Sequence, residues 1–383
     1  MDQVVGAVGE VATRWAGDRT RLARRSLDPA DFAELRATGL LGLAVPVALG
    51  GAWQGSGATR PLIETYRRLA RADPSVALVS SMHPAVLSYW AIPSSDDPAW
   101  TAQCEAVAAS ALAGEQWGTI TSEPGSGGDI MKTTARATPR PEVTFLPGDG
   151  VGISGDKHFG SGSGMCDRMV TTARVDGEDA PSIFVLDTTE RAWDGTAGFQ
   201  LLAEWDGMGM SATQSHAMRL DGAPAVRLAW PGALEDVTLG AGPFISTLFT
   251  AVVLGVLDEA VATARTQLAG KADQLRAYEQ VEWSRAELDH WLAQQAYEGA
   301  VRALEAGDPA RALHAALRAK QGVAELAEGT LQRLSRVLGG GTFSQRSPFA
   351  RWFEDVRALG FLRPPWGLAY DTLFLTSFTP VDD

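Results

Sequence analysis

The chain has 383 residues, a formal net charge of −13 at pH 7 and no cluster of basic residues. This charge balance argues against nucleic acid or an anionic membrane as its main partner. Hydrophobic residues make up 45% of the chain, which is enough for a buried interior, and the length favours two or three packed units over a single core.

The two cysteines, Cys104 and Cys166, cannot build a disulfide framework and fit a reducing compartment. The N-terminal segment lacks a basic leader followed by an apolar stretch, so no export signal is expected. No run of residues approaches the composition and length of a membrane span. We therefore expect a cytoplasmic protein without a membrane partner. No His, Cys and carboxylate residues stand at metal-site spacing, so we also expect no metal.

Residues 1–116 are expected to form a helical unit. In the segment 60–72, apolar residues recur at helical spacing opposite an arginine-rich face, which predicts an amphipathic helix. The pairs Asp28-Pro29 and Asp73-Pro74 are typical helix starts, with an aspartate cap followed by proline in the first turn.

Residues 117–230 differ in character and are rich in Gly, Thr, Ser and Val. Short apolar runs at 168–175 and 182–186 predict strands. Three Asp-Gly pairs predict turns between strands, at 176–177, 206–207 and 221–222. This part is expected to be a β unit.

Helical periodicity returns in residues 231–383. The long periodic segments lie at 244–268, 274–306 and 309–338. Their lengths favour a bundle of antiparallel helices.

The most informative segment is 117–129, which reads WGTITSEPGSGGD. Its first half favours extended backbone, whereas Pro124 and the glycines that follow it end a strand and permit positive φ. Such a loop can bring backbone N–H groups and short hydroxyls against a flat heteroaromatic ring, because no bulky side chain blocks the approach. An ordinary hairpin loop is the alternative that this segment alone leaves open.

Five segments in order resemble motifs of the acyl-CoA dehydrogenase superfamily of flavoproteins, and with the order of helical and β units the resemblance extends over essentially the whole chain. Residues 122–129 are similar to the flavin loop T-E-P-G-x-G-S-D, with Ser122 in place of Thr and Gly128 in place of Ser. The other four are GDKHFGS at 155–161, similar to G-x-K-x-W-I-T; GMGMSAT at 207–213, similar to L-G-M-R-G-T; LDEA at 257–260; and LGGGTF at 338–343, similar to G-G-x-G-F.

The resemblance implies an α+β fold with an N-terminal helical domain over 1–116, a middle β-barrel domain over 117–230 and a C-terminal four-helix bundle over 231–383. It also implies a flavin, FAD or FMN, between barrel and bundle of a homotetramer or homodimer. The adenosine end of FAD, if present, would be held by the neighbouring subunit near Gly339 and Gly340.

Carried over by position, the family pattern implies that Thr121 and Ser122 bond the pyrimidine edge of the flavin. Phe159 would flank the ring where the family has Trp, and Ser161 would stand at the ring edge in place of Thr. The remaining loop positions expected at the cofactor are Trp117, Gly127 and Gly128. A reduced flavin gains electron density around N1 and O2, which fixed hydroxyl and backbone donors stabilise.

The chain departs from the family's dehydrogenases at the catalytic base. Arg363 stands where the usual Glu is found, and Ala241 falls near the second known location of this acid. An arginine cannot act as a base near neutral pH, because its pKa lies above about 12. Arg363 is nevertheless a candidate catalytic residue, and one interpretation is that it pairs with a substrate carboxylate or phosphate. The alternative is a structural ion pair with Asp355 or Asp371.

The loss of the base points to another branch of the superfamily, the reduced-flavin monooxygenases and N-oxygenases. Some members use a histidine in the N-terminal helical domain, and His83 stands at that place, although a hydrogen-bonded core histidine is the alternative. The second histidine of those members, near the C-terminus, has no counterpart, since no His follows His314.

The resemblance thus implies a reduced-flavin monooxygenase that hydroxylates or N-oxidises a small metabolite through a C4a-hydroperoxyflavin. Such an enzyme can receive its reduced flavin from a separate flavin reductase. The runner-up is an acyl-CoA dehydrogenase with a relocated base. A third hypothesis is a flavin-free binding paralogue, to which the departures at Gly128 and Phe159 lend support.

Overall fold

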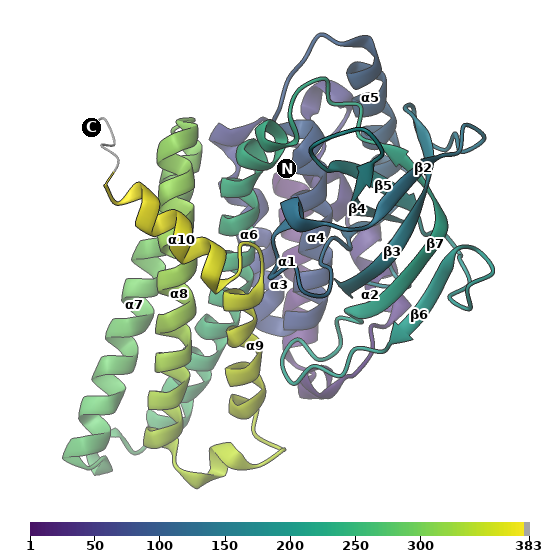
Figure 1. Cartoon of the computed structure of the whole chain (residues 1–383). Coiled ribbons are helices and arrows are strands. Elements are labelled where there is room, and N and C mark those ends of the chain that lie inside the picture. Colours follow the sequence, from purple (N-terminus) through teal and green to yellow (C-terminus); the bar gives the residue numbers. More distant parts are fainter. Residues whose placement is uncertain (379–383) are drawn as a thin grey trace.

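A computed structural model describes residues 1–378, so the last five residues of the expected C-terminal unit lie outside it. Helices come first along the chain, then strands, then helices again (Figure 1). The first helices are α1 (Asp2–Ala16), α2 (Pro29–Ala37), α3 (Arg60–Ala72), α4 (Pro74–Ala91) and α5 (Pro98–Leu112).

The predicted helix starts are confirmed by their capping geometry. Asp28 accepts a hydrogen bond from the Ala30 N–H at 2.9 Å at the start of α2, and Asp73 accepts one from the Val76 N–H at 3.0 Å at the start of α4. Helix α3 has the predicted bounds. Its apolar face is buried, because Leu62, Ile63 and Leu69 are inaccessible to solvent.

The strands form a closed five-stranded barrel with two further strands attached. In chain order they are β1 (Trp117–Thr119), β2 (Arg136–Pro139), β3 (Gly150–Gly160), β4 (Arg168–Val175), β5 (Ser182–Asp187), β6 (Phe199–Ala203) and β7 (His216–Arg227). The barrel runs β4-β2-β3-β7-β5 and closes by pairing β5 with β4. Strand β1 pairs in parallel with β4, and β6 pairs with β7.

One prediction for the β unit is confirmed and another is wrong. Strand β4 has the predicted bounds. The turn predicted at Asp221-Gly222 is wrong, because β7 continues through it. Gly222 has a φ of +63°, and the register of β7 against β3 shifts at this point, so the pair forms a bulge instead.

The last helices are α6 (Leu234–Leu268), α7 (Ala277–Glu305), α8 (Pro309–Leu338), α9 (Phe349–Phe361) and α10 (Trp366–Thr376). Helix α8 has the predicted bounds, but α6 begins ten positions before the expected residue 244. Pro243 lies inside α6 and is buried, so tertiary packing outweighs the tendency of proline to end a helix.

A polar contact inside this packing explains the LDEA segment of α6. Asp258 accepts a hydrogen bond from Arg67 Nε of α3 at 2.7 Å, and its other oxygen lies 2.7 Å from His290 Nε2 of α7. One carboxylate therefore joins three helices. The N-terminal helices and the bundle also share one continuous hydrophobic core, whereas the barrel interior forms a second.

Among residues 1–378, α6 alone is long and apolar enough to cross a membrane by length and composition. The expectation that no segment approaches such a span is therefore wrong. Of its most apolar window, 78% is buried inside the protein, and core helices of this kind pass the same test. Helix α6 packs against α3, α4, α7, α8 and α9, which accounts for its apolar composition.

Candidate functional site

The two segments that resemble flavin motifs are paired in space. Ser122 and His158 form an antiparallel bridge, in which the His158 N–H donates to the Ser122 carbonyl at 2.8 Å. Just before it, Thr171 of β4 donates its hydroxyl to the Ile120 carbonyl at 2.7 Å. The 120–129 loop is therefore fixed against both β3 and β4, and it presents Thr121 and Ser122 half-buried at the end of the barrel.

A buried ion pair between Glu123 and Lys157 joins this loop to strand β3. Lys157 Nζ lies 2.6 Å from Glu123 Oε1 and donates to the Thr172 carbonyl at 2.6 Å, and the lysine is fully buried. Glu123 also accepts hydrogen bonds from the Thr133 hydroxyl and from the Thr134 N–H, the latter at 2.6 Å. Burial opposes its charge, but these donors outweigh burial and lower the pKa of Glu123 to about 2. The Glu of the first motif and the Lys of the second are thus structural partners.

The glycines of the loop serve a turn that packs against the bundle. Gly125, Gly127 and Gly128 all have positive φ. A Cβ on Gly128 would lie 2.8 Å from Cγ of Pro365, whereas one on Gly127 would meet nothing within 4 Å. The absence of the family's Ser at position 128 therefore has a packing cause, because Pro365 occupies the space that a side chain would need.

Replacing Gly128 with alanine should destabilise the protein more than the same change at Gly125. Both substitutions force a left-handed residue, which costs about 1–2 kcal/mol. Position 125 is open, whereas position 128 collides with Pro365 and should lose a further amount of about 1–3 kcal/mol through overpacking. Urea unfolding of the two variants measures the difference. Equal losses would contradict the close contact.

Phe159 is presented outward in a strained conformation. Its φ is +60°, which is rare for an aromatic residue, and 60% of its surface is exposed. Its ring stands edge-on to Trp205 with centroids 6.2 Å apart. Strained backbone persists where the surroundings fix it, often at ligand sites. Two positions further along the chain, Ser161 is buried, and its hydroxyl lies 2.8 Å from the hydroxyl of Ser215.

Arg363 reaches this loop from the far end of the chain. It lies between α9 and α10, and its Nη2 donates to Ser122 Oγ at 3.1 Å across 241 positions of sequence. Burial lowers the pKa of Arg363, and the nearby Tyr89 and Asp129 oppose that effect. Within residues 1–378 it forms no ion pair with a carboxylate, so the alternative of a pair with Asp355 or Asp371 is not observed.

The barrel and the bundle also meet through the GMGMSAT segment. Asp355 of α9 accepts a hydrogen bond from the Met210 N–H at 2.6 Å. A Cβ on Gly209 would lie 2.1 Å from the Glu354 carbonyl oxygen, so this glycine lets the loop backbone touch the backbone of α9. Burial raises the pKa of Asp355 to about 7.

His83 and Trp117 lie in the core. His83 Nε2 donates to the Leu41 carbonyl at 3.0 Å, and Nδ1 accepts the Trp117 N–H at 3.1 Å. Burial lowers the pKa of His83 to about 4, so the ring is neutral. The Trp117 ring is fully buried against Trp90, and its Nε1 donates to Ser110. This geometry is that of a hydrogen-bonded core histidine. Both side chains are fully buried, so neither has a surface that a ligand could contact.

Gly339 and Gly340 do not join the loop within one chain. They precede α9, whereas Arg363 follows it, and a helix of 13 residues separates the two places by about 20 Å. Figure 1 shows this turn at the opposite end of α9 from α10. The role that the resemblance implies for these glycines, through a neighbouring subunit, stays a prediction.

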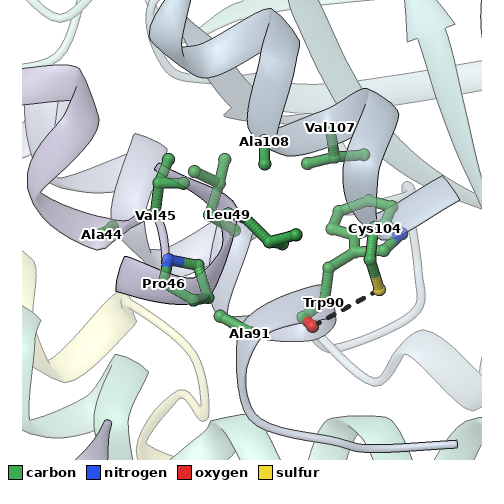
Figure 2. Close-up of a pocket in the computed structure, with 10 residues that line it drawn as sticks. Ala44, Val45, Pro46, Leu49, Trp90, Ala91, Cys104, Val107 and Ala108 are labelled. Atoms are coloured by element: carbon green, nitrogen blue, oxygen red, sulfur yellow. Dashed lines mark hydrogen bonds between the residues drawn. The ribbon is translucent and has the colours of Figure 1, made fainter. Parts of the chain in front are cut away.

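Two hollows elsewhere in the molecule contain none of the expected site residues. Figure 2 shows the first, an apolar pocket beside Trp90 and Cys104 with a volume of about 10 Å³, enough for about one water molecule. The Cys104 thiol lies 3.7 Å from the Trp90 carbonyl, and burial raises its pKa to about 11. The second is an open groove of about 890 Å³ along α1 and α3, where Arg68 and Arg71 contribute to the lining.

No family model matches the chain. The amino sugar nitrososynthase DnmZ of Streptomyces peucetius is 28% identical over 229 residues, 55% of each chain. The dibenzothiophene monooxygenase of Mycolicibacterium goodii is 28% identical over 250 residues, 61% of this chain and 54% of that protein. The chain thus spans about half the length of these two relatives. L-evernosamine nitrososynthase of a Micromonospora strain is 25% identical over 390 residues, 95% of this chain and 86% of that protein.

Solved structures resemble the whole fold. KijD3 in complex with dTDP has a TM-score of 0.81 at 22% identity and covers 98% of this chain and 96% of its own. FMN-bound TdsC from Paenibacillus sp. A11-2 has a TM-score of 0.80 at 20% identity and covers 98% and 97%. The chain therefore has the fold of these acyl-CoA dehydrogenase-like proteins, and in sequence it is similar to flavin monooxygenases and nitrososynthases.

Proposed function

We propose that the protein is a reduced-flavin monooxygenase that adds oxygen to a small aromatic or amine-bearing metabolite. Arg363 carries this proposal. Its guanidinium stands at the position matching the dehydrogenases' Glu and contacts Ser122 of the flavin loop. It cannot remove a proton, so the proton abstraction that begins α,β-dehydrogenation has no agent there. Ala241, near the second location of the acid, is fully buried.

The carboxylates near the loop do not replace that base. Glu123 is committed to Lys157 and to hydroxyl and backbone donors. Asp129 accepts a hydrogen bond from the Met131 N–H at 2.9 Å and begins a short turn. These contacts favour oxygen transfer over the runner-up, dehydrogenation of an acyl-CoA.

The residues at the loop fit a flavin. Ser122 and Thr121 would bond the pyrimidine edge, and Phe159 would flank the ring. Arg363 would hold a positive charge near the N1–O2 side, where reduction accumulates electron density. When bound, the reduced flavin supplies electrons to O2. The chain's own part is to bind and orient the ring, and to limit water around it with Phe159 and Trp205.

FMN is the favoured cofactor because solved neighbours carry it: TdsC is described as FMN-bound, and KijD3 is described in complex with FMN and a dTDP-linked amino keto sugar. Curated relatives described as nitrososynthases and a dibenzothiophene monooxygenase support an amine- or sulfur-bearing or aromatic substrate for this chain. We also propose that a separate flavin reductase supplies the reduced cofactor, as the resemblance implies.

Three outcomes separate the hypotheses. Protein that binds reduced FMN and consumes O2 supports the monooxygenase. Yellow protein that bleaches with acyl-CoA under argon supports the dehydrogenase. Protein that binds neither oxidised nor reduced FMN or FAD supports the flavin-free paralogue, although Gly128 lends that hypothesis less weight now that Pro365 explains its missing side chain.

Removing both loop hydroxyls should weaken flavin binding. The double variant Thr121→Val with Ser122→Ala should lose about 2–3 kcal/mol of FMN binding free energy, taking about 1–1.5 kcal/mol per hydrogen bond. Fluorescence titration with FMN measures the loss. Thr101→Val, at an exposed hydroxyl on α5, is the matched control and should bind like the wild type. Unchanged affinity in the double variant would refute the loop assignment.

We further propose three units with bounds 1–116, 117–230 and 231–383, and a homodimer or homotetramer formed through α7. Exposed apolar residues on one face of α7 support such an interface: Tyr278, Val281, Leu288, Trp291 and Leu292. Sedimentation of the protein as a monomer at micromolar concentration would contradict the oligomer.

A further inference from the structure

Lys320 is a fully buried lysine without an acidic partner. It lies on α8, and its side chain has no solvent exposure. Its Nζ donates to two backbone carbonyls, that of Leu359 at 2.7 Å and that of Pro364 at 2.9 Å. Within residues 1–378 no carboxylate forms an ion pair with it, and burial lowers its pKa to about 7. A buried amine that is paired only with carbonyls is unfavourable for stability, so its presence calls for another reason.

The two carbonyls define what Lys320 holds. The Leu359 carbonyl belongs to the last turn of α9, where helix carbonyls lack partners and carry partial negative charge. The Pro364 carbonyl follows Arg363 directly. Lys320 therefore ties the end of α9 to the turn formed by residues 362–365, which we call the Arg363 turn.

The Arg363 turn contacts the flavin loop at two points. Arg363 donates to Ser122 Oγ at 3.1 Å, and Pro365 occupies the space beside Gly128. The only hydrogen bond from the guanidinium to the rest of residues 1–378 is the one to Ser122, and the charge of Asp129 in the same loop attracts it as well. On the bundle side, the carbonyl next to it is held by Lys320.

We propose that Lys320 is a positioning residue for the flavin site, which sets Arg363 against Ser122 by holding the Arg363 turn to α8. This inference rests on the proposed function, because it takes the loop around Ser122 as the flavin-binding edge. Lys320 itself is shielded from any ligand. Its effect on the cofactor passes through Arg363.

The test compares FMN affinity in Lys320→Met, Arg363→Met and the double variant, with Lys271→Met as control because Lys271 is exposed. Arg363→Met should bind reduced FMN about 10-fold or more weakly, as expected for a hydrogen bond to a charged group. Lys320→Met should lose a similar factor, and the double variant should be no more than about 3-fold weaker than the worse single variant, because both act through one contact. Lys271→Met should bind within about 2-fold of the wild type. The proposal would be overturned if the fold-losses in FMN affinity of the two single variants multiplied in the double variant. It would also be overturned if Lys320→Met bound FMN like the wild type while Arg363→Met bound it more weakly.

A second measurement does not depend on the flavin. Methionine fills the space of the buried lysine without its charge, so Lys320→Met should fold with a thermal midpoint close to that of the wild type. In the absence of FMN, amide hydrogen exchange should become faster in 359–372 and in 121–129 of this variant, but not in Lys271→Met. Unchanged exchange in those segments would overturn the positioning role. Faster exchange in Lys320→Met, together with wild-type FMN affinity in Arg363→Met, would give a different result. It would support the role of Lys320 in holding the Arg363 turn but refute the assignment of the flavin site.

Discussion

Replacing Glu123 with glutamine should lower the free energy of unfolding by about 3–5 kcal/mol, because removing one partner of a buried ion pair leaves the other charge uncompensated. Lys157 is fully buried, and in the variant its ammonium would face a neutral amide oxygen in place of the carboxylate. Guanidinium unfolding monitored by tryptophan fluorescence measures the loss.

The neighbouring strand position supplies a matched control. Asp156 forms an ion pair with Arg219 at 2.8 Å, but both side chains are exposed, so Asp156→Asn should change the unfolding midpoint far less. Adding Lys157→Met to the Glu123→Gln variant should recover part of the stability, since the buried charge is then gone. A loss in Glu123→Gln no larger than that in Asp156→Asn would contradict a buried pair at this site.

Asp355→Asn should become more stable relative to the wild type as pH rises from about 4 to about 7. Burial raises the folded-state pKa of Asp355 to about 7, above its ordinary value of 3.8. Between these values the folded protein holds a proton that the unfolded chain has released, so the contribution of Asp355 to stability is present below pH 3.8 and is lost as pH rises through 7. The full difference corresponds to about 4 kcal/mol.

Asparagine can still accept the Met210 N–H but cannot ionise, so the variant lacks this loss. The quantity to measure is the difference in unfolding free energy between variant and wild type at pH 4.5 and pH 8. Taking the difference cancels the contribution of His83, whose lowered pKa makes stability fall with acidification instead. Asp176→Asn, at an exposed carboxylate paired with Arg136, is the control. A difference that does not vary with pH would contradict the buried acid.

Local signals predicted the parts of the fold that local chemistry decides. The aspartate caps at Asp28 and Asp73 and the apolar stripe of α3 are set by neighbours within a few residues, and these predictions are confirmed. The start of α6 and the bulge in β7 are set by tertiary packing. Proline usually interrupts a helix and Asp-Gly usually forms a turn, so the sequence predicted a boundary near Pro243 and near Gly222. In the structure, packing against neighbouring elements lets α6 and β7 continue through these residues.

At the site, sequence reasoning named Ser122 and Arg363 separately but could not foresee their contact, which depends on how the bundle docks on the barrel. It missed the roles of Glu123, Lys157 and Lys320. One signal could have shown two of them: the chain has only four lysines, and two of these are fully buried while the other two are exposed. Because the chain otherwise uses arginine, each of its few lysines is a candidate for a position where a compact ammonium is needed.

Gly209 limits how the molecule can admit a ligand. The loop backbone at Gly209 lies directly on the Glu354 carbonyl, and the Met210 N–H donates a hydrogen bond to Asp355. This face of α9 is therefore closely packed against the barrel loop. The other contacts beside Ser122 come from Arg363 and Pro365, at the junction of α9 and α10, so widening the space there would have to move this junction. For the proposed flavin site, access to the ring edge would then depend on the short helix α10 rather than on separation of barrel and bundle.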